Sequence, residues 1–124
     1  MEEIIAVLNK SNIIVKSKDN IYQLIIPAKV NENLDIEYKI YIENNDKGYK
    51  LTDKKNILKS MNEIYELSSN DVKQCINDVL KFYNFSLVKG EIFCEITKEN
   101  CLQRLFNLIQ VYSQLINMFI FFNN

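Results

Sequence analysis

The fold class is decided by residues 34–43, which read Leu34-Asp35-Ile36-Glu37-Tyr38-Lys39-Ile40-Tyr41-Ile42-Glu43. Apolar and polar side chains alternate along almost the whole stretch. The apolar positions all fall on one face, and they are Leu34, Ile36, Tyr38, Ile40 and Ile42. A period of two residues is typical of a strand with one buried face and one solvated face. We therefore predict a strand over residues 34–43 in an antiparallel sheet.

Other strands are expected on both sides of this one. Runs rich in β-branched residues at 13–15 and 21–26 flank Lys18-Asp19-Asn20, which predicts a hairpin. A turn at residues 44–48 leads into a short strand at residues 49–51. Near the other end of the chain, residues 85–88 and 91–96 flank Lys89-Gly90, and glycine at a tight turn predicts a second hairpin.

Four stretches are expected to be helical. The first covers residues 2–10. Thr52 or Asp53 is placed to cap a second helix, and a residue of the run Ser69-Asn70-Asp71 is placed to cap a third, which extends to Tyr83. The last runs from about Lys98 to the end. We expect one domain over residues 1–124, an α+β fold with a mainly antiparallel sheet packed against two or three helices, the long apolar C-terminal helix being central.

The C-terminal helix carries no charged side chain from Leu105 onward, a length that could span a membrane. Its polar residues recur at spacings of three and four along one narrow stripe, and they are Gln103, Asn107, Gln110, Gln114 and Asn117. This regular stripe favours one wetted edge of a core helix over a membrane span. From Met118 to Phe122 every position is apolar, so we expect a homodimer interface formed by Phe119, Ile120, Phe121 and Phe122.

Composition argues against several classes of function. Fifteen basic and sixteen acidic residues give a net charge of −1, and Arg104 is the only arginine, which disfavours nucleic acid as the main partner. Without histidine there is no Ser–His or Cys–His nucleophile and no histidine-containing zinc site. The three cysteines, Cys75, Cys94 and Cys101, lack metal-binding spacing, so we expect no metal or other cofactor and a reducing, cytoplasmic location.

One catalytic alternative remains on the strand at residues 34–43. Asp35, Glu37 and Lys39 share its polar face, and carboxylates beside a lysine are typical of nucleases that hold Mg²⁺. The simpler interpretation is the solvated face of an ordinary strand, and we favour it.

Three further residues are candidates for surface binding. Tyr41 is an aromatic residue on the charged side of its strand, and Lys54 and Lys55 follow the predicted cap. Together with Lys59, these lysines are also the basis of a second alternative, a weak nucleic-acid-binding regulator.

The order of elements resembles a family of small bacterial and phage proteins known only as a domain of unknown function. The resemblance covers roughly residues 20–118 and rests on Leu51-Thr52-Asp53, Gly90-Glu91-Ile92 and the apolar helix with Leu108-Ile109-Gln110. Lys54 and Lys55 stand where that family usually has an acidic residue and a glycine. The resemblance implies the fold layout and an origin in a bacterium or mobile element. The abundance of Ile, Asn and Lys separately indicates a genome rich in A and T, such as that of a low-GC bacterium or one of its phages. We expect a non-catalytic protein-binding module of the bacterial cytoplasm, encoded by a phage or mobile element, with an inhibitor of a bacterial defence protein as its narrower form.

Overall fold

The computed structural model describes residues 1–26, 37–65 and 67–122. A six-stranded sheet forms one layer, and all five of its strand pairings are antiparallel. In chain order its strands are β1 (Ile14–Lys18), β2 (Ile21–Ile25), β3 (Ile40–Asn45), β4 (Gly48–Thr52), β5 (Ser86–Val88) and β6 (Glu91–Ile96). Their order across the sheet is β1-β2-β3-β4-β6-β5, so the last strand lies between β4 and the short edge strand β5.

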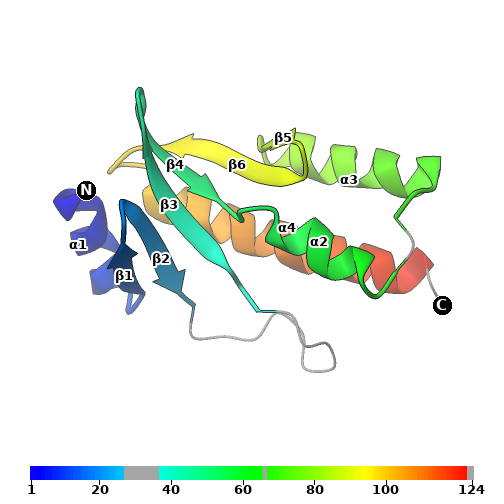
Figure 1. Cartoon of the computed structure of the whole chain (residues 1–124), viewed down its shortest axis with the longest axis horizontal. Helices are drawn as coiled ribbons and strands as arrows, with labels where there is room; N and C mark the ends of the chain where they lie inside the picture. Colours follow the sequence, from blue (N-terminus) through cyan, green and yellow to red (C-terminus); the bar gives the residue numbers. More distant parts are fainter. Residues whose placement is uncertain (27–36, 66, 123–124) are drawn as a thin grey trace.

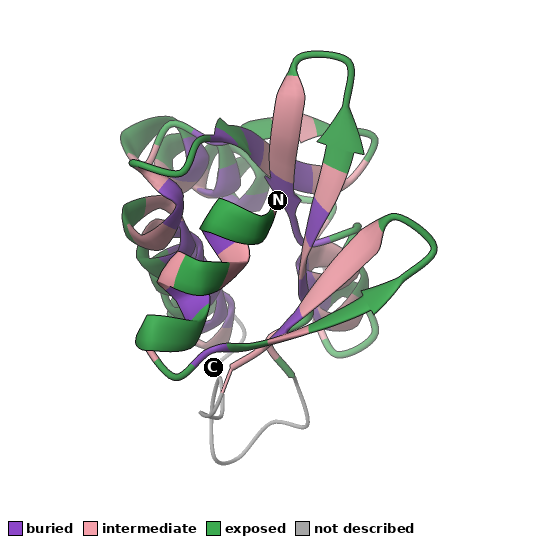
Figure 2. Cartoon of the chain, turned by 90° about the vertical axis from the view of Figure 1, so that its left-hand side faces the viewer, coloured by how far each residue is buried: buried purple, intermediate pink, exposed green. Residues whose placement is uncertain are grey.

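Four helices complete the fold, and they are α1 (Glu2–Lys10), α2 (Asn56–Asn62), α3 (Asn70–Phe82) and α4 (Cys101–Phe122). In Figure 1, α4 lies behind the sheet, with α1 at one end and α3 alongside. Figure 2 shows most of the helices gathered on one side of the strands, while the β1–β2 and β3–β4 hairpins project on the other side. The predicted α+β class, the antiparallel sheet and the long C-terminal helix are confirmed.

The predicted strand at residues 34–43 is wrong at residues 37–39, which are not in a strand. Its first three residues lie outside the described part of the chain, and β3 begins only at Ile40. The Lys39 N–H donates to the Glu37 carbonyl at 3.1 Å, which makes a tight turn where the sequence predicts a strand. The alternation of apolar and polar side chains extends into this turn because Tyr38 still faces inward, where it packs against the Tyr112 ring of α4 with 5.3 Å between ring centroids.

Two helix starts also differ from expectation. The last helix begins at Cys101, because Thr97 and Asn100 exchange backbone-to-side-chain hydrogen bonds in the turn before it. The second begins only at Asn56, after Lys55 with its left-handed φ of 67°, although the Asp53 carboxylate still accepts from the Ile57 N–H in its first turn. Ser69, one of the three residues expected to cap α3, is the cap, since its hydroxyl accepts from the Val72 N–H at 3.2 Å.

The core lies between the sheet and α4. Eight residues of α4 are buried, and they are Cys101, Leu105, Leu108, Val111, Tyr112, Leu115, Ile116 and Phe119. At a rise of about 1.5 Å per residue, a 22-residue helix is far longer than strands of five or six residues. Part of α4 therefore extends past the sheet, where α2 contacts it and contributes the buried Ile57 and Met61.

By length and composition alone, α4 is the one helix among the described residues that could cross a membrane. Its buried stripe packs against the sheet and the other three helices of the described chain. Packing of this kind is typical of the central helix of a folded core.

Candidate functional site

The face of the sheet that points away from α4 carries most of the polar side chains that could form a site. Strand alternation turns Ile40 and Ile42 inward and leaves Tyr41 and Glu43 on this open face. The register then sets Glu43 beside Lys50 of β4, and Lys50 beside Glu95 of β6. Charged residues from three neighbouring strands are thereby placed side by side.

Two segments far apart in the sequence meet where β4 leaves the sheet. The Thr52 hydroxyl donates to Oε2 of Glu91 at 2.5 Å and accepts from the Lys54 N–H at 2.9 Å. The Asp53 N–H donates to the Ile92 carbonyl, and the Ile92 N–H returns a bond to Oδ1 of Asp53 at 2.9 Å. The two motifs that carry the family resemblance, Leu-Thr-Asp and Gly-Glu-Ile, are therefore in direct contact.

Asp53 is fully buried and organises this junction. Besides Ile92, its carboxylate accepts from the Lys55 N–H at 3.0 Å and from the Ile57 N–H at 3.0 Å, in the first turn of α2. Burial raises the pKa of Asp53 above its ordinary value, although the three backbone N–H groups oppose the shift. Every polar contact of this carboxylate is internal, so Asp53 acts as a structural bridge between β4, β6 and α2.

A network of charges surrounds the junction on the open face. Lys50 Nζ lies 3.1 Å from Oε2 of Glu91 and 3.8 Å from Oε2 of Glu43, and Lys54 Nζ lies 2.8 Å from Oε1 of Glu43. Burial by itself would raise the pKa of Glu91, but the Thr52 hydroxyl and the charges of Lys50 and Lys54 lower it overall. These four side chains largely neutralise one another and leave no charged group poised for proton transfer.

A hollow of about 510 Å³ opens beside this network. Its lining comes from the β1–β2 hairpin, from β3 and from the loop after β4, and consists of Lys16, Ser17, Lys18, Asp19, Ile21, Gln23, Tyr41 and Lys54. Lys54 Nζ lies 5.9 Å from the centre of the Tyr41 ring. The structure thus brings together Tyr41 and Lys54, two of the three predicted surface-binding residues, whereas the exposed Lys55 is not part of the lining. The lysines of β1 were missed because nothing in the sequence tells which strands lie near Tyr41.

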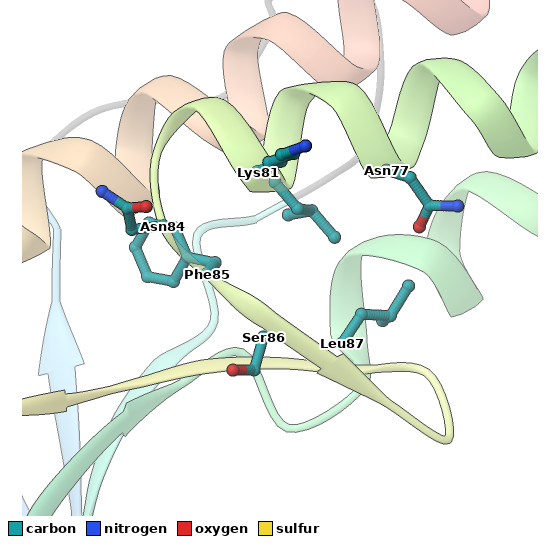
Figure 3. Close-up of a pocket in the computed structure, with 7 residues that line it drawn as sticks. Asn77, Lys81, Asn84, Phe85, Ser86 and Leu87 are labelled. Atoms are coloured by element: carbon teal, nitrogen blue, oxygen red, sulfur yellow. The ribbon is translucent and has the colours of Figure 1, made fainter.

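A second hollow, of about 460 Å³, lies between α3 and β5 (Figure 3). Asn77 and Lys81 come from α3, and Ser86 and Leu87 come from β5. Close by, the guanidinium of Arg104 donates to the carbonyls of Tyr83 and Asn84 at 2.7 and 2.8 Å. The single arginine therefore caps the C-terminal end of α3, a structural role that the sequence did not reveal.

The exposed face of α4 differs from the open sheet face because it lacks charge. Apart from Phe122 at its end, its exposed residues follow one stripe, which we call the α4 outer face: Gln103, Phe106, Gln110, Ser113, Gln114, Asn117 and Phe121. Four of the five predicted stripe residues belong to it, and Asn107 is half-buried beside it.

The predicted interface at the end of α4 needs one correction. Phe119 is fully buried in the core and cannot lie in a surface interface, because it falls on the buried stripe of α4. Ile120 is half-buried, and Phe121 and Phe122 are exposed.

The predicted nuclease residues are not brought together in the described chain. Asp35 lies outside the described residues, while Glu37 and Lys39 are exposed in the turn before β3. Within residues 1–26, 37–65 and 67–122 there is no group of three or more His, Cys, Asp or Glu residues that could hold a metal ion. Burial raises the pKa of both Cys94 and Cys101, which keeps these thiols protonated and unreactive.

Comparison with known proteins gives one match. The family model described as Domain of unknown function DUF1828 matches residues 31–115, which include both motifs of the junction and most of α4. No curated protein and no solved structure was found to match the chain.

Proposed function

Since the chain belongs to the DUF1828 family, whose description names no activity, we propose a role from its own surfaces: it is a non-catalytic protein-binding module that works as a homodimer. In this proposal the α4 outer face joins two copies, and the open sheet face of each copy receives the partner protein. The observation that carries the proposal is the uncharged α4 outer face.

Apolar exposure on α4 supports a contact there. Phe106 is 49% exposed and Phe121 is 76% exposed, and both lie on the same side of the helix. Charged residues are depleted at the centre of protein interfaces, while aromatic residues are enriched. Burying a large apolar side chain contributes roughly 1.5–3 kcal/mol, so two copies gain several kcal/mol by covering these rings.

The sequence of the outer face is complementary to itself. If two α4 helices pack antiparallel about a two-fold axis between Ser113 and Gln114, Phe106 lies opposite the partner's Phe121. In the same arrangement Gln110 lies opposite the partner's Asn117. Side-chain amides both donate and accept hydrogen bonds, so they can pair across a symmetric contact in which like charges would repel.

The partner protein is expected among bacterial proteins. A bacterial defence protein as the target, with a phage or mobile element as the source, is the narrower hypothesis. It is supported by the small size of the chain and by its many Ile, Asn and Lys residues, which are encoded by codons rich in A and T. It stays a prediction. Recovery of a stoichiometric partner from host lysate would identify the target.

The dimer is tested by light scattering after size exclusion at micromolar concentration. We expect the wild type to have twice the mass of one chain. Phe106→Glu and Phe121→Glu should each give a monomer, because each would bury one glutamate without a partner charge at both ends of the symmetric contact.

Val88→Glu is the matched control, since Val88 is 52% exposed at the tip of the β5–β6 hairpin and outside α4. This variant should remain dimeric. A monomeric wild type, or a Phe106→Glu chain that remains dimeric, would contradict the proposed contact.

A further inference from the structure

The edge strand β1 and the hollow beside it form a basic surface in an otherwise slightly acidic chain. Lys16, Lys18 and Lys54 bring three ammonium groups to the hollow, against the single carboxylate of Asp19. Lys54 is already paired with Glu43, whereas Lys16 and Lys18 form no ion pair with any residue that the structure describes. Positive charge therefore remains uncompensated on one strand.

This strand also offers unpaired backbone groups. β1 pairs with β2 on one side only, and on its other side no described strand accompanies it. An exposed sheet edge can accept one further extended segment through main-chain hydrogen bonds. The opposite edge strand, β5, has only three residues and is the poorer template.

The side chains of β1 define what such a segment must contain. Every second residue of β1 faces the core. The residues between them lie on the open face, and they are Ile14, Lys16 and Lys18, paired with Ile25, Gln23 and Ile21 of β2. Residues directly opposite on paired strands have Cβ atoms about 4.5–5.5 Å apart. A segment paired to β1 therefore meets two lysines at alternate positions and then Ile14, which is 59% exposed.

We propose that β1 binds an acidic, extended peptide segment of the partner protein, which adds to the sheet as a seventh strand. The segment it recognises carries two carboxylates two residues apart, opposite Lys16 and Lys18. An apolar side chain lies opposite Ile14, two residues from the carboxylate that faces Lys16; it comes before or after the carboxylates in the peptide, depending on the direction of the added strand. The hollow between β1, Tyr41 and Lys54 takes the acidic side chain that reaches over the sheet. This inference rests on the protein-binding role proposed above, although it does not require the α4 contact.

A peptide fits this surface better than a nucleic acid does. The carboxylates of Asp19 and Glu43 lie within or next to the basic groups and would repel a continuous phosphate backbone. The surface has no arginine, the residue that binds phosphate in a bidentate manner. Edge lysines also keep two β1 strands from pairing with each other, so the same charges that discourage self-association select an acidic strand.

The test is fluorescence anisotropy with labelled six-residue peptides in which Glu alternates with Thr and one end carries Ile. We expect saturable binding that weakens as salt is added. Replacing both Glu residues by Gln, or placing Pro in the middle of the peptide, should abolish it, because the first removes the charge pairing and the second a main-chain donor. Equal binding of the Gln peptide or of the Pro peptide would overturn the proposal.

Variants of the full chain locate the site. Lys16→Glu/Lys18→Glu should weaken binding by about tenfold or more, since two attractive pairs become repulsive. Lys16→Gln/Lys18→Gln should weaken it less. The control, Lys47→Glu/Lys73→Glu, has the same net charge as the first variant and alters exposed residues away from the hollow, so it should bind like the wild type.

Two further outcomes separate this inference from its alternatives. A single-stranded oligonucleotide that binds more tightly than the Glu peptide, and through the same two lysines, would overturn it in favour of nucleic acid. Unchanged peptide binding by Phe121→Glu supports the β1 site whether or not the α4 dimer exists. Failure of all Glu peptides to bind a wild-type dimer would overturn the β1 site and leave the dimer standing.

Discussion

Asp53 and Glu91 lie at the same junction, yet their surroundings shift their pKa values in opposite directions. Asp53 is fully enclosed, and burial raises its pKa. Glu91 remains partly exposed and has Lys50 at 3.1 Å, so its pKa falls despite some burial. Ionisation of Glu91 therefore stabilises the fold, whereas ionisation of Asp53 opposes it.

Glu91→Gln should reduce the dependence of stability on acid pH. A carboxyl whose folded pKa is lowered contributes stability above its unfolded value of about 4.3, and that contribution is lost as the pH falls through the folded value. The variant should lose about 1–2 kcal/mol of unfolding free energy at pH 7, because a neutral amide no longer supplies the negative charge that strengthens the contacts with Thr52 and Lys50. Urea unfolding at pH 7, 5 and 3 measures both effects.

Glu95→Gln is the control for this pH series, since Glu95 lies on the same strand but is exposed. Its unfolding curves should follow those of the wild type at each pH. A Glu91→Gln chain with the full acid sensitivity of the wild type would show that the junction does not depend on this charge.

Asp53→Asn should destabilise the chain even though it removes a buried charge. The carboxylate accepts on both oxygens, and an amide has only one oxygen, so its NH₂ group would face either the Ile57 N–H or the N–H groups of Lys55 and Ile92. An unsatisfied buried donor costs about 1–3 kcal/mol. Thermal unfolding at pH 7 measures the loss, and an Asp53→Asn melting temperature at or above that of the wild type would contradict the bridging role.

At the scale of elements, α3 depends on a residue from another helix. The carbonyls at its C-terminal end are satisfied by Arg104 of α4, whose guanidinium also lies 4.4 Å from the centre of the Phe85 ring. A planar group with several donors can bridge two carbonyls while it stacks on a ring, which an ammonium group cannot do equally well.

Arg104→Gln should therefore lower the unfolding free energy by about 1–3 kcal/mol, with Arg104→Lys between this variant and the wild type. Urea unfolding followed by circular dichroism gives these values. Lys98→Gln serves as the control, because the Lys98 pair with Glu3 is exposed and 3.9 Å long and should contribute little. A loss for Lys98→Gln as large as that for Arg104→Gln would argue against the helix-capping role.

Periodicity predicted most elements, because helices and hairpins follow local rules. The Lys89-Gly90 turn, the Ser69 cap and the β1–β2 hairpin were all expected, and each depends on residues within a few positions of one another. The strand prediction was wrong at residues 37–39 because the alternation of apolar and polar side chains continues into a turn that Tyr112 holds in place, with its hydroxyl donating to the Lys39 carbonyl. Local patterns do not distinguish such a turn from a strand.

For the molecule as a whole, the missing information was which elements become neighbours. Three features join residues far apart in sequence. They are the pairing of β6 with β4, the hydrogen bond from Thr52 to Glu91, and the presence of Lys16 and Tyr41 in the lining of one hollow. Composition and spacing contain no record of these contacts. The candidate site was therefore only partly foreseen: Tyr41 and Lys54 were named, and the lysines of β1 were not.

The position of α4 in the chain has a consequence for synthesis of the protein. Its buried residues fill the centre of the core, yet every strand precedes it in the sequence. A ribosome that adds about 5–20 residues per second needs about one to four seconds for these 22 residues. During that interval Ile40, Ile42 and Leu51 of the nascent sheet are not yet covered by α4, so we expect a chaperone to protect them or strand pairing to wait for α4.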